Sequence, residues 1–487
     1  MSSPTLKLLK ADLFKSSSEN LTDDERIDLS YQRAYAVAKA YSLEISDILD
    51  LIPKFWQIHQ DMALSLDHAA HTLISIQYNI AGATFAIMQL MLTEVGHGLD
   101  SRNLETTATL LPNGDFDIHT PNSNAAKFTA PSWPRKGFPR VALVFARLLF
   151  SGDDWGVNPF IVWLKDESFM VMTRRGAVGS LAFTTVLIPL MKRAVSVAGK
   201  YSLRRQITRQ NSKPVPIISL RTQQLPILHA LAQIAVFEPF AQDSIQQFKR
   251  SNDILVIQQV ISFTFKAVRC QASQPMFHAL SERCGAQGLW EYNQIIGSQL
   301  ETRMISIAEG DISAMNIKIG TELLLNRYQP PAPMNPACLL AQHEKGLFDE
   351  SRSILKGLKG GHRHAKFNSL ILPRCQALVE AIGHRRAYEA AAKAGVDSDL
   401  LALYEIHAVL LDPSWYIQHT HLTREYLFQK EARLLDTLLP RLDSLLDATG
   451  VGLYCTAPIL SQASWDAFVD RLKTLEGVGM REDKARL

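Results

Sequence analysis

Two short segments in the second half of the chain hold the residues best suited to chemistry. The first, residues 281–290, ends a helix and runs into a glycine turn that contains Gln287 and Gly288, because glycine disfavours a helix interior. The second, residues 307–312, carries Glu309 beside a glycine and opens a new amphipathic segment. A carboxylate held at a turn among apolar residues has a raised pKa and can act as a base near neutral pH. An ordinary helix cap is the competing interpretation for an acidic residue at a helix start.

Three other groups of polar residues are weaker candidates. Glu94 and His97 have the E-x-x-H spacing of di-iron carboxylate helices, but the motif occurs once and a glycine splits it, so we expect no metal site. His68 and His71 lie three apart; His71 could face a ligand, but the favoured interpretation is that both are ordinary histidines on a helix surface. The basic, glycine-rich segment 356–366 could contact a phosphate of coenzyme A, whereas a solvated loop is favoured. The chain has no G-x-S-x-G, P-loop or G-x-G-x-x-G motif.

The composition is that of a globular chain with a large core: 487 residues, 47% hydrophobic and 20% charged, enough for three or four domains. A net charge of +3 is too balanced to imply nucleic-acid binding. Five scattered cysteines without a C-x-x-C pair argue against zinc and disulfides and for a reducing compartment. The N-terminus lacks the continuous apolar core of a signal peptide. The uncharged segment 176–191 is too short for a membrane span and is better interpreted as a buried helix.

The elements that must position the candidate residues begin with helices and continue with strands. Thr22–Glu25 is a capping box that predicts a helix start, and Pro53 predicts another. From Thr93 the pattern changes, because alternating segments flank the turn Pro112–Gly114 and a second pair flanks the longer loop Ser151–Gly156. We therefore expect a small antiparallel β domain. Its strands are expected at 106–111, 116–119, 140–150 and 159–164.

The second half of the chain is predicted to be helical. Segment 176–325 is typical of four long helices, and residues 258–268 are apolar nearly all round, as at the centre of a bundle. The proline-rich segment 328–336 cannot be helical and is the clearest linker. Further helices are expected at 338–358 and 370–394, with others up to residue 475. The predicted fold class is therefore mostly α with a small antiparallel β domain.

The motifs Thr-Glu-x-Gly-His-Gly (93–98), Leu-Glu-Thr-Thr-Ala-Thr (104–109) and Ala-Glu-Gly-Asp (308–311) together resemble those of the acyl-CoA oxidase and acyl-CoA dehydrogenase family. Thr-Glu-x-Gly-His-Gly at 93–98 with Leu-Glu-Thr-Thr-Ala-Thr at 104–109 is similar to the family's flavin-contacting strand, and this pair is specific. Glu-Arg-Cys-Gly-Ala-Gln-Gly at 282–288, followed by Ala-Glu-Gly-Asp at 308–311, resembles the family's glycine turn and catalytic-glutamate segment. The order is collinear over nearly the whole chain, from about residue 22 to 475. Further matches lie at 51–56, 73–79, 198–205 and 221–224.

The resemblance implies helical bundles and a flavoenzyme that performs the α,β-dehydrogenation of an acyl-CoA thioester. A base takes the acidified α proton, and FAD takes the β hydrogen as hydride, since no side chain can. Glu309 matches the family's base, Thr93 the residue that hydrogen-bonds the isoalloxazine edge, and Arg205 the residue that meets the FAD pyrophosphate across a homodimer interface. Gln287 and Gly288 match the turn on the adenosine side, with Gln287 replacing a histidine. A second C-terminal helical domain favours an oxidase, with O2 as acceptor and H2O2 as product, over a dehydrogenase that uses an electron-transfer flavoprotein.

The chain also departs from the family pattern. Several tens of residues are missing after Ala81, and roughly the last half of the β domain is missing. Segment 127–134 lacks the family's paired glycines at a second flavin contact, as in a divergent, shortened fungal-type branch of the oxidases. Two functions are therefore open: an enzyme of fatty-acid β-oxidation or of a secondary-metabolite or toxin pathway, and a non-catalytic scaffold that has lost flavin binding. The presence of Glu309, Thr93 and Arg205 together favours the enzyme.

The last three residues, Ala485–Leu487, fit the degenerate form of the Ser-Lys-Leu signal that the peroxisomal import receptor reads. We therefore expect a peroxisomal protein that binds this receptor. The expected parts are a shortened N-terminal helical domain (1–89), a truncated β domain (90–173), a first C-terminal bundle with FAD and the catalytic glutamate (174–328), a linker (329–336), a second C-terminal helical domain (337–478) and the tail (479–487).

Overall fold

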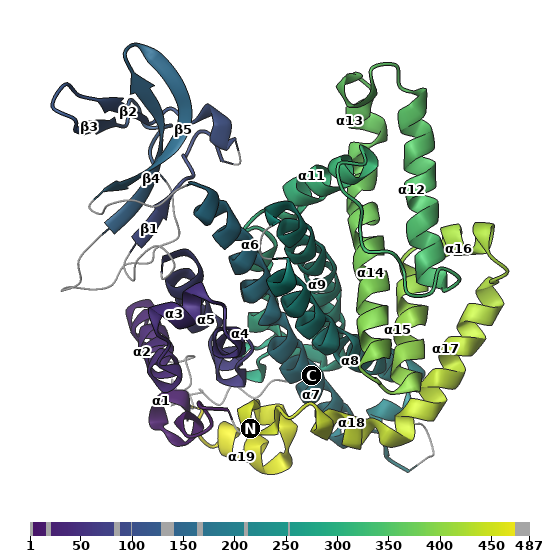
Figure 1. Ribbon diagram of the computed structural model, residues 1–487. Helices are drawn as coiled ribbons and strands as arrows, with labels where there is room; N and C mark the ends of the chain where they lie inside the picture. The colour runs from purple at the N-terminus through teal and green to yellow at the C-terminus, as the bar shows by residue number, and fades with distance from the viewer. Residues whose placement is uncertain are drawn as a thin grey trace, which may run out of the picture.

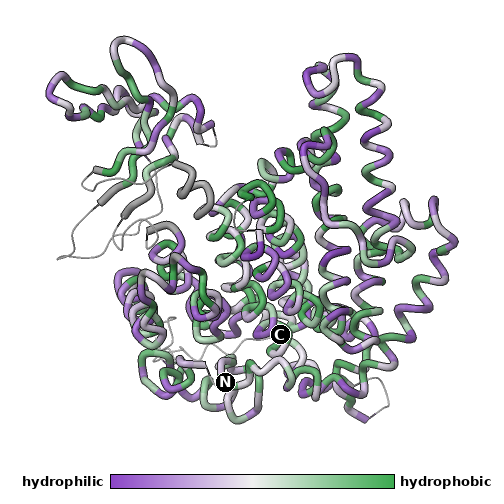
Figure 2. The backbone as a smooth tube through the Cα atoms, viewed as in Figure 1, coloured by the Kyte–Doolittle hydropathy of each residue, from purple (hydrophilic) through white to green (hydrophobic). Residues whose placement is uncertain are grey.

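The computed structural model of the chain describes residues 3–15, 21–81, 88–98, 100–127, 141–162, 169–208, 213–251 and 254–472. Long helices form the centre of the molecule, and a small sheet stands to one side of them (Figure 1). The N-terminal helices lie below the sheet in this view, and a second group of helices covers the opposite side of the centre. Figure 2 shows that apolar residues concentrate on the central helices, and the largest buried cluster lies there.

The N-terminal helices begin where the sequence predicts. Thr22 and Glu25 form the expected capping box, in which the Thr22 hydroxyl accepts from the Glu25 N–H and the Glu25 carboxylate accepts from the Thr22 N–H (2.8 Å). Pro53 occupies the first turn of its helix, where its missing N–H costs nothing. The described helices of this part are α1 (Asp12–Lys15), α2 (Asp23–Tyr41), α3 (Ile45–Leu49), α4 (Pro53–His59) and α5 (His68–Ser75), followed by a π-helical segment (Ile76–Ala81).

The prediction that His68 and His71 lie on a helix surface is wrong. Both side chains are buried, and both rings stack on the ring of Phe183 from a helix far along the chain. His59 is buried with them, and the Ser75 hydroxyl lies 3.4 Å from a ring nitrogen of His59 and of His71. Burial lowers the pKa of His59 to about 3, that of His68 to about 4 and that of His71 well below its ordinary value, so all three are neutral at physiological pH.

The sheet is mixed, which corrects the predicted antiparallel topology. β1 and β2 both run parallel to β4, while β3 pairs antiparallel with β2 and β5 pairs antiparallel with β4. β1 aligns with residues 141–144 of β4 and β2 with residues 147–149, so β1 and β2 lie end to end along one edge of β4. Parallel pairs join segments distant in the chain, so the local pattern could not reveal them. The strands are β1 (Met88–Met91), β2 (Thr107–Leu110), β3 (Phe116–His119), β4 (Val141–Phe150) and β5 (Asp153–Val162).

Both predicted hairpins are present, but the second has a shorter turn than predicted. The turn at 112–114 joins β2 to β3 as expected. In the second hairpin Ser151 and Gly152 form the whole turn, with φ angles of 55° and 88° that suit a two-residue type I′ turn. Asp153 already pairs with Phe150, so the polar residues that suggested a loop belong to an exposed strand.

The central part is helical, as the sequence predicts, but its described residues form six helices, α6 to α11, where four long ones were expected over 176–325. Residues 169–173, which we placed in the β domain, form the start of α6 instead. In α9 the residues 260–270 are all buried, as expected for the centre of a bundle. The helices are α6 (Phe169–Thr185), α7 (Leu187–Arg204), α8 (Arg221–Arg250), α9 (Leu255–Arg283), α10 (Ile296–Thr302) and α11 (Ile312–Leu324).

One stretch among the described residues, Gly176–Arg204 of α6 and α7, is long and apolar enough to cross a membrane by length and composition. Within it, 94% of the most apolar window is buried inside the protein. The segment 176–191 is therefore the buried helix that the sequence predicts.

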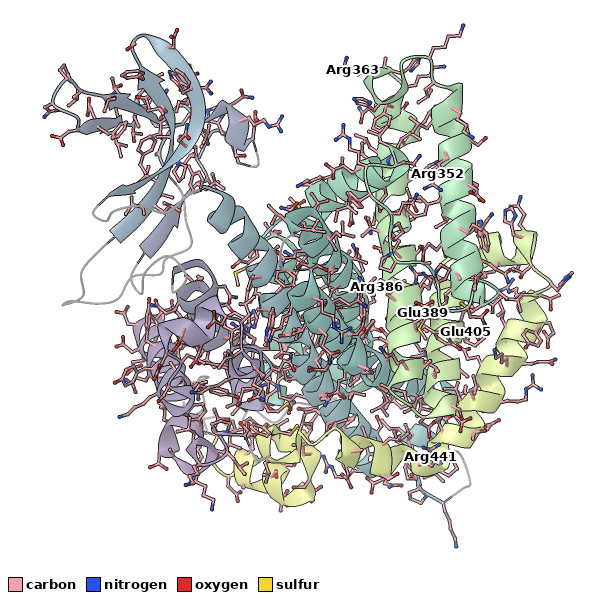
Figure 3. All side chains as sticks on the ribbon, in the orientation of Figure 1. Arg352, Arg363, Arg386, Glu389, Glu405 and Arg441 are labelled. Atoms are coloured by element: carbon pink, nitrogen blue, oxygen red, sulfur yellow. The ribbon has the colours of Figure 1, made fainter. Side chains whose placement is uncertain are left out.

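The second group of helices follows the predicted linker, which contains no helix. Arg386 ties this group to the centre, because its guanidinium donates to the Gln247 side chain of α8 at 2.6 Å (Figure 3). Its neighbour Arg385 forms a buried ion pair with Glu344 of α12. The helices are α12 (Leu339–Gly357), α13 (Phe367–Leu370), α14 (Cys375–Lys393), α15 (Ser398–Leu411), α16 (Pro413–His419), α17 (Arg424–Leu438), α18 (Leu442–Ala448) and α19 (Gln462–Val469).

Candidate active site

The start of α11 explains the position of Glu309. Asp311 is the N-cap, and its carboxylate accepts a hydrogen bond from the Ala314 N–H at 2.9 Å. Glu309 and Gly310, just before the cap, have φ angles of 58° and 104°, so the chain makes a left-handed turn there. This conformation is uncommon for a glutamate, and it persists only where the surroundings hold it. The capping role belongs to Asp311, so the interpretation of Glu309 as the helix cap is wrong.

Two glycines allow the Glu309 turn to approach the bundle closely. The Glu309 carboxylate lies against α6 at Gly179, where a Cβ would be 2.5 Å from its Oε2. A side chain at position 179 would therefore displace either the carboxylate or the helix. Gly310 packs on Phe263 of α9, where a Cβ would be 2.8 Å from the ring. The carboxylate is thus held between α6 and α9, which lie side by side in Figure 1.

The surroundings of Glu309 make its carboxyl group a weak acid. Burial raises its pKa to about 7, and the positive charge of Lys266 on α9 opposes that rise. A carboxyl group with this pKa is partly ionised at neutral pH and can accept a proton from a substrate. This is the property that a general base needs.

Two residues of this site, Gly179 and Lys266, were not predicted from the sequence. A signal for Lys266 was present, because a lysine within the apolar segment 260–270 has to be buried, and lysine is almost never fully buried without a partner. A glycine inside a helix, such as Gly179, offers a weaker signal of close approach by another group.

Thr93 lies in the loop after β1 and not on a strand, which corrects our expectation. Its half-buried side chain is next to Glu94, whose carboxylate is enclosed. That carboxylate accepts hydrogen bonds of 2.6–3.0 Å from the N–H groups of Glu105 and Thr106, the Thr106 hydroxyl and the Lys127 ammonium. Burial alone would raise the pKa of Glu94, but these hydrogen bonds lower it to about 2. Glu94 therefore fastens the loop that carries Thr93 to the sheet.

Both residues of the E-x-x-H motif, Glu94 and His97, take part in this hydrogen-bond network. His97 Nε2 lies 2.8 Å from the Glu105 carboxylate and 3.8 Å from that of Glu94. Within the described ranges, no group of three or more His, Cys, Asp or Glu side chains is arranged to hold a metal ion.

The other three site residues predicted from the sequence lie at the ends of helices. Arg205 follows the last turn of α7 with an exposed side chain, and no described residue pairs with its guanidinium. Gln287 is half-buried in a 3-10 turn after α9, and its side-chain carbonyl accepts from the Asn293 amide at 3.1 Å. Gly288 is buried where a Cβ would be 1.9 Å from the Ser281 carbonyl oxygen. Packing against α9 therefore explains this glycine without a ligand.

Within one chain, Arg205 lies near the glycine turn after α9 but far from Glu309. Gln223 of α8 donates to Ser202 Oγ near the end of α7 (2.7 Å) and to the Arg283 carbonyl at the end of α9 (2.8 Å). Arg205 and the glycine turn after α9 therefore lie at the same end of the bundle. Glu309 contacts α9 about 25 Å from that end, at 1.5 Å per residue.

Two cavities lie away from Glu309. One of about 380 Å³ is lined by residues of α7 and α8, including Lys192 and Glu238, and one of about 540 Å³ by α12, α14 and α16, including Trp415. The basic segment 356–366 is a largely exposed connection between α12 and α13, in agreement with the solvated loop that the sequence favours.

Comparison with protein families points to one family. The family model described as "Acyl-CoA oxidase, C-alpha1 domain" matches residues 169–324, which contain α6 to α11. "Peroxisomal acyl-coenzyme A oxidase 1" of Arabidopsis thaliana is 47% identical over 77 residues, 15% of this chain and 11% of that protein. "Acyl-coenzyme A oxidase 3" of Yarrowia lipolytica is 40% identical over 134 residues, 23% of this chain and 18% of that protein. The matched segments thus span less than a fifth of these relatives' length.

Solved structures share the fold over nearly the whole chain. Acyl-CoA oxidase 1 of Yarrowia lipolytica superimposes with a TM-score of 0.82 at 15% identity, over 97% of this chain and 90% of the other. Acyl-CoA oxidase 1 of Caenorhabditis elegans, "complexed with FAD and ATP", superimposes with a TM-score of 0.76 at 16% identity, over 97% and 91%. Residues 169–324 therefore match an acyl-CoA oxidase C-alpha1 domain, and the chain as a whole has the fold of the acyl-CoA oxidases, in agreement with the predicted resemblance.

Proposed function

We propose that the chain is a flavoenzyme that oxidises an acyl-CoA thioester to the α,β-unsaturated acyl-CoA, with Glu309 as the base. The observation that carries this proposal is the Glu309 carboxyl group, which has a pKa of about 7 and lies in a left-handed turn between α6 and α9. The proposed acceptor is O2, with H2O2 as the product, and the reaction belongs to fatty-acid β-oxidation or to a secondary-metabolite pathway.

Glu309 supplies the proton transfer in this reaction. The ionised carboxylate takes the α proton, which the thioester carbonyl acidifies, and the C–H electron pair forms the new double bond. FAD, when bound, supplies the acceptor for the β hydrogen and its electron pair. The contact with Gly179 and the left-handed turn fix the direction from which the carboxylate meets the substrate.

The residues proposed to hold FAD have suitable chemistry but lie in different parts of one chain. The Thr93 hydroxyl can donate to or accept from the edge of a flavin ring, and the exposed Arg205 guanidinium suits a pyrophosphate. Gln287 and Gly288 lie near Arg205, about 25 Å along α9 from the Glu309 turn. A homodimer in which one chain supplies Thr93 and Glu309, and the other supplies Arg205, would bring both groups to one FAD. The Arg205→Met variant should then lose flavin affinity, and a monomer by light scattering that binds one flavin per chain would contradict this shared site.

The visible absorbance spectrum tests the proposed function against the non-catalytic scaffold. The purified protein incubated with FAD and freed of excess should be yellow with one flavin per chain. Anaerobic addition of butanoyl-, octanoyl- or hexadecanoyl-CoA should bleach the flavin, and air should restore the colour and yield H2O2. A protein that folds, dimerises and takes up no flavin would support the scaffold. A flavin that is bleached but needs an electron-transfer flavoprotein for reoxidation would contradict O2 as the acceptor.

Peroxisomal import is a separate part of the proposal. Relatives of the chain include a protein named as a peroxisomal oxidase, and the Ala485–Leu487 tripeptide, which lies outside the described residues, has the composition of an import signal. The last dozen residues fused to a fluorescent protein should direct it to peroxisomes. A diffuse signal that does not change when Leu487 is deleted would contradict this proposal.

A further inference from the structure

Lys266 makes an unusual contact with the turn that carries Glu309. It lies in the middle of α9 and is 1% exposed. Its ammonium donates to the carbonyl oxygen of Ala308 and, at 2.6 Å, to that of Gly310. These two carbonyls belong to the residues on either side of Glu309. One cation therefore bonds the backbone both before and after the residue proposed as the base.

The burial of this lysine needs a reason, because removing a charge from water is unfavourable. Its hydrogen bonds to Ala308 and Gly310 go to backbone carbonyls, so they neutralise no charge. These hydrogen bonds stabilise the left-handed backbone conformation at Glu309, which is uncommon for glutamate and needs support from its surroundings. The ammonium also attracts the Glu309 carboxylate electrostatically.

We propose that Lys266 is a positioning residue for the base: its ammonium holds the Glu309 turn in place, and its charge keeps the neighbouring carboxylate ionised. This inference deepens the proposed function and rests on it for its catalytic meaning. The contact itself can be tested without flavin or substrate.

The two groups titrate in adjoining pH ranges. Burial lowers the pKa of Lys266 to about 8, against the opposing effect of Cys270 on α9 and of Glu309 and Asp311 on the turn. Burial raises the pKa of Glu309 to about 7. The carboxylate is ionised above about pH 7 and the ammonium is charged below about pH 8, so both are in the required state between these values. The rate of flavin reduction should therefore pass through a maximum there and fall on both sides.

The first test is a titration of the Glu309 carboxyl group in the full chain without flavin. Infrared difference spectra between the wild type and Glu309→Gln isolate this one carboxyl band as the pH is changed. The same difference, taken in a Lys266→Met background, should show ionisation at higher pH, because an opposite charge nearby lowers the pKa of a carboxyl group by about 1–3 units. The ionised fraction at neutral pH should fall about fivefold or more. In Lys266→Arg, which keeps the charge, the titration should stay close to that of the wild type.

Two further variants separate this role from general packing. Lys266→Gln keeps an N–H donor without the charge, and it serves if the methionine variant does not fold. Lys318→Met is the matched control, since Lys318 donates to the Gln259 side chain (2.9 Å) and links α11 to α9 without contacting the Glu309 turn. The control should leave the Glu309 titration unchanged. An unchanged titration in Lys266→Met, or in Lys266→Gln, would overturn the inference.

The second test uses flavin-loaded protein and distinguishes the two proposals. With octanoyl-CoA, Lys266→Met should move the rise in the rate of flavin reduction to higher pH, and Lys266→Arg should restore it. If the wild type takes up no flavin, the proposed function fails while the infrared result stands. If the wild type reduces its flavin and Lys266→Met has the same pH profile, the inference fails and the proposed function stands.

Discussion

Two acidic side chains, Glu94 beside the sheet and Glu309 between the helices, show how surroundings decide what a carboxylate does. Glu94 is buried, yet four donated hydrogen bonds keep its pKa near 2. Burial raises the pKa of Glu309 to about 7, and the nearby ammonium of Lys266 bonds the adjacent backbone carbonyls. Donors aimed at the carboxylate give a permanent anion that holds a loop, whereas donors aimed at the backbone leave a carboxylate able to exchange a proton.

The largest effect expected from this comparison is on the stability of the sheet. Glu94→Gln would leave the Lys127 ammonium without its buried partner and turn an amide N–H toward other donors, at a cost of about 3–5 kcal/mol. Hydrogen exchange should show faster opening of β1 to β4, while α6 to α9 stay protected. Glu105→Gln, on a more exposed carboxylate, is the control and should have a much smaller effect. Equal loss of protection in the sheet and in α6 to α9 would contradict a local role for the Glu94 hydrogen bonds.

Acid should affect the two parts in different pH ranges. His59, His68 and His71 have lower pKa values folded than unfolded, so the unfolded chain binds more protons and stability falls as the pH drops from about 6.5 toward 4. The contribution of Glu94 is present above about pH 4.5 and is lost only as the pH falls toward 2. Thermal unfolding and hydrogen exchange of the protein without flavin should show helices α4 to α6 losing a few kcal/mol before the sheet. Opening of the sheet first would contradict this order.

A smaller effect on stability, with a larger one on activity, is expected at Gly179. In Gly179→Ala the new Cβ would overlap the Glu309 carboxylate, at a cost of about 1–3 kcal/mol. The rate of flavin reduction should fall by about a hundredfold, because the base is displaced by an ångström or more. Gly176→Ala is the matched control on the same helix, since a Cβ there meets nothing within 4 Å. Equal rates in the two variants would show that the carboxylate does not need this contact.

The smallest effect is expected at Thr93, on the sheet side of the proposed flavin site. Thr93→Val removes one hydroxyl and keeps the shape of the side chain, so flavin affinity should fall by about five-fold, the equivalent of a hydrogen bond of about 1 kcal/mol. Thr437→Val in α17, outside every segment proposed to contact flavin, provides the control and should bind flavin as the wild type does. Titration with FAD, followed by quenching of flavin fluorescence, measures both. A Thr93→Val protein with unchanged affinity would remove this residue from the site.

Local sequence signals predicted the elements that depend on neighbouring residues. The capping box at Thr22–Glu25, the Pro53 helix start and the turn at 112–114 are confirmed, because each depends on residues within a few positions. Features that depend on distant partners were not predictable in this way. The buried histidines need Phe183 from α6, and the parallel pairs need β4, so neither left a local signal.

The candidate site likewise combines a residue that could be predicted locally with contacts that depend on distant parts of the chain. Glu309 could be named from its motif and from the glycine beside it. Its contact with Gly179 and the Lys266 bonds to its flanking carbonyls could not, since they join segments about 40 to 130 residues apart that meet only when α6 and α9 pack. The roles of Thr93, Arg205, Gln287 and Gly288 in flavin binding stay predictions.

The most direct test of the account is the reaction of the Glu309→Gln protein with an acyl-CoA. Glutamine has nearly the shape of glutamate and cannot take a proton, so this variant should bind FAD as the wild type does and reduce it about a hundredfold to ten-thousandfold more slowly with octanoyl-CoA. Stopped-flow absorbance under anaerobic conditions measures this rate. Flavin retention with loss of bleaching is the predicted result, and bleaching at the wild-type rate would show that Glu309 is not the base.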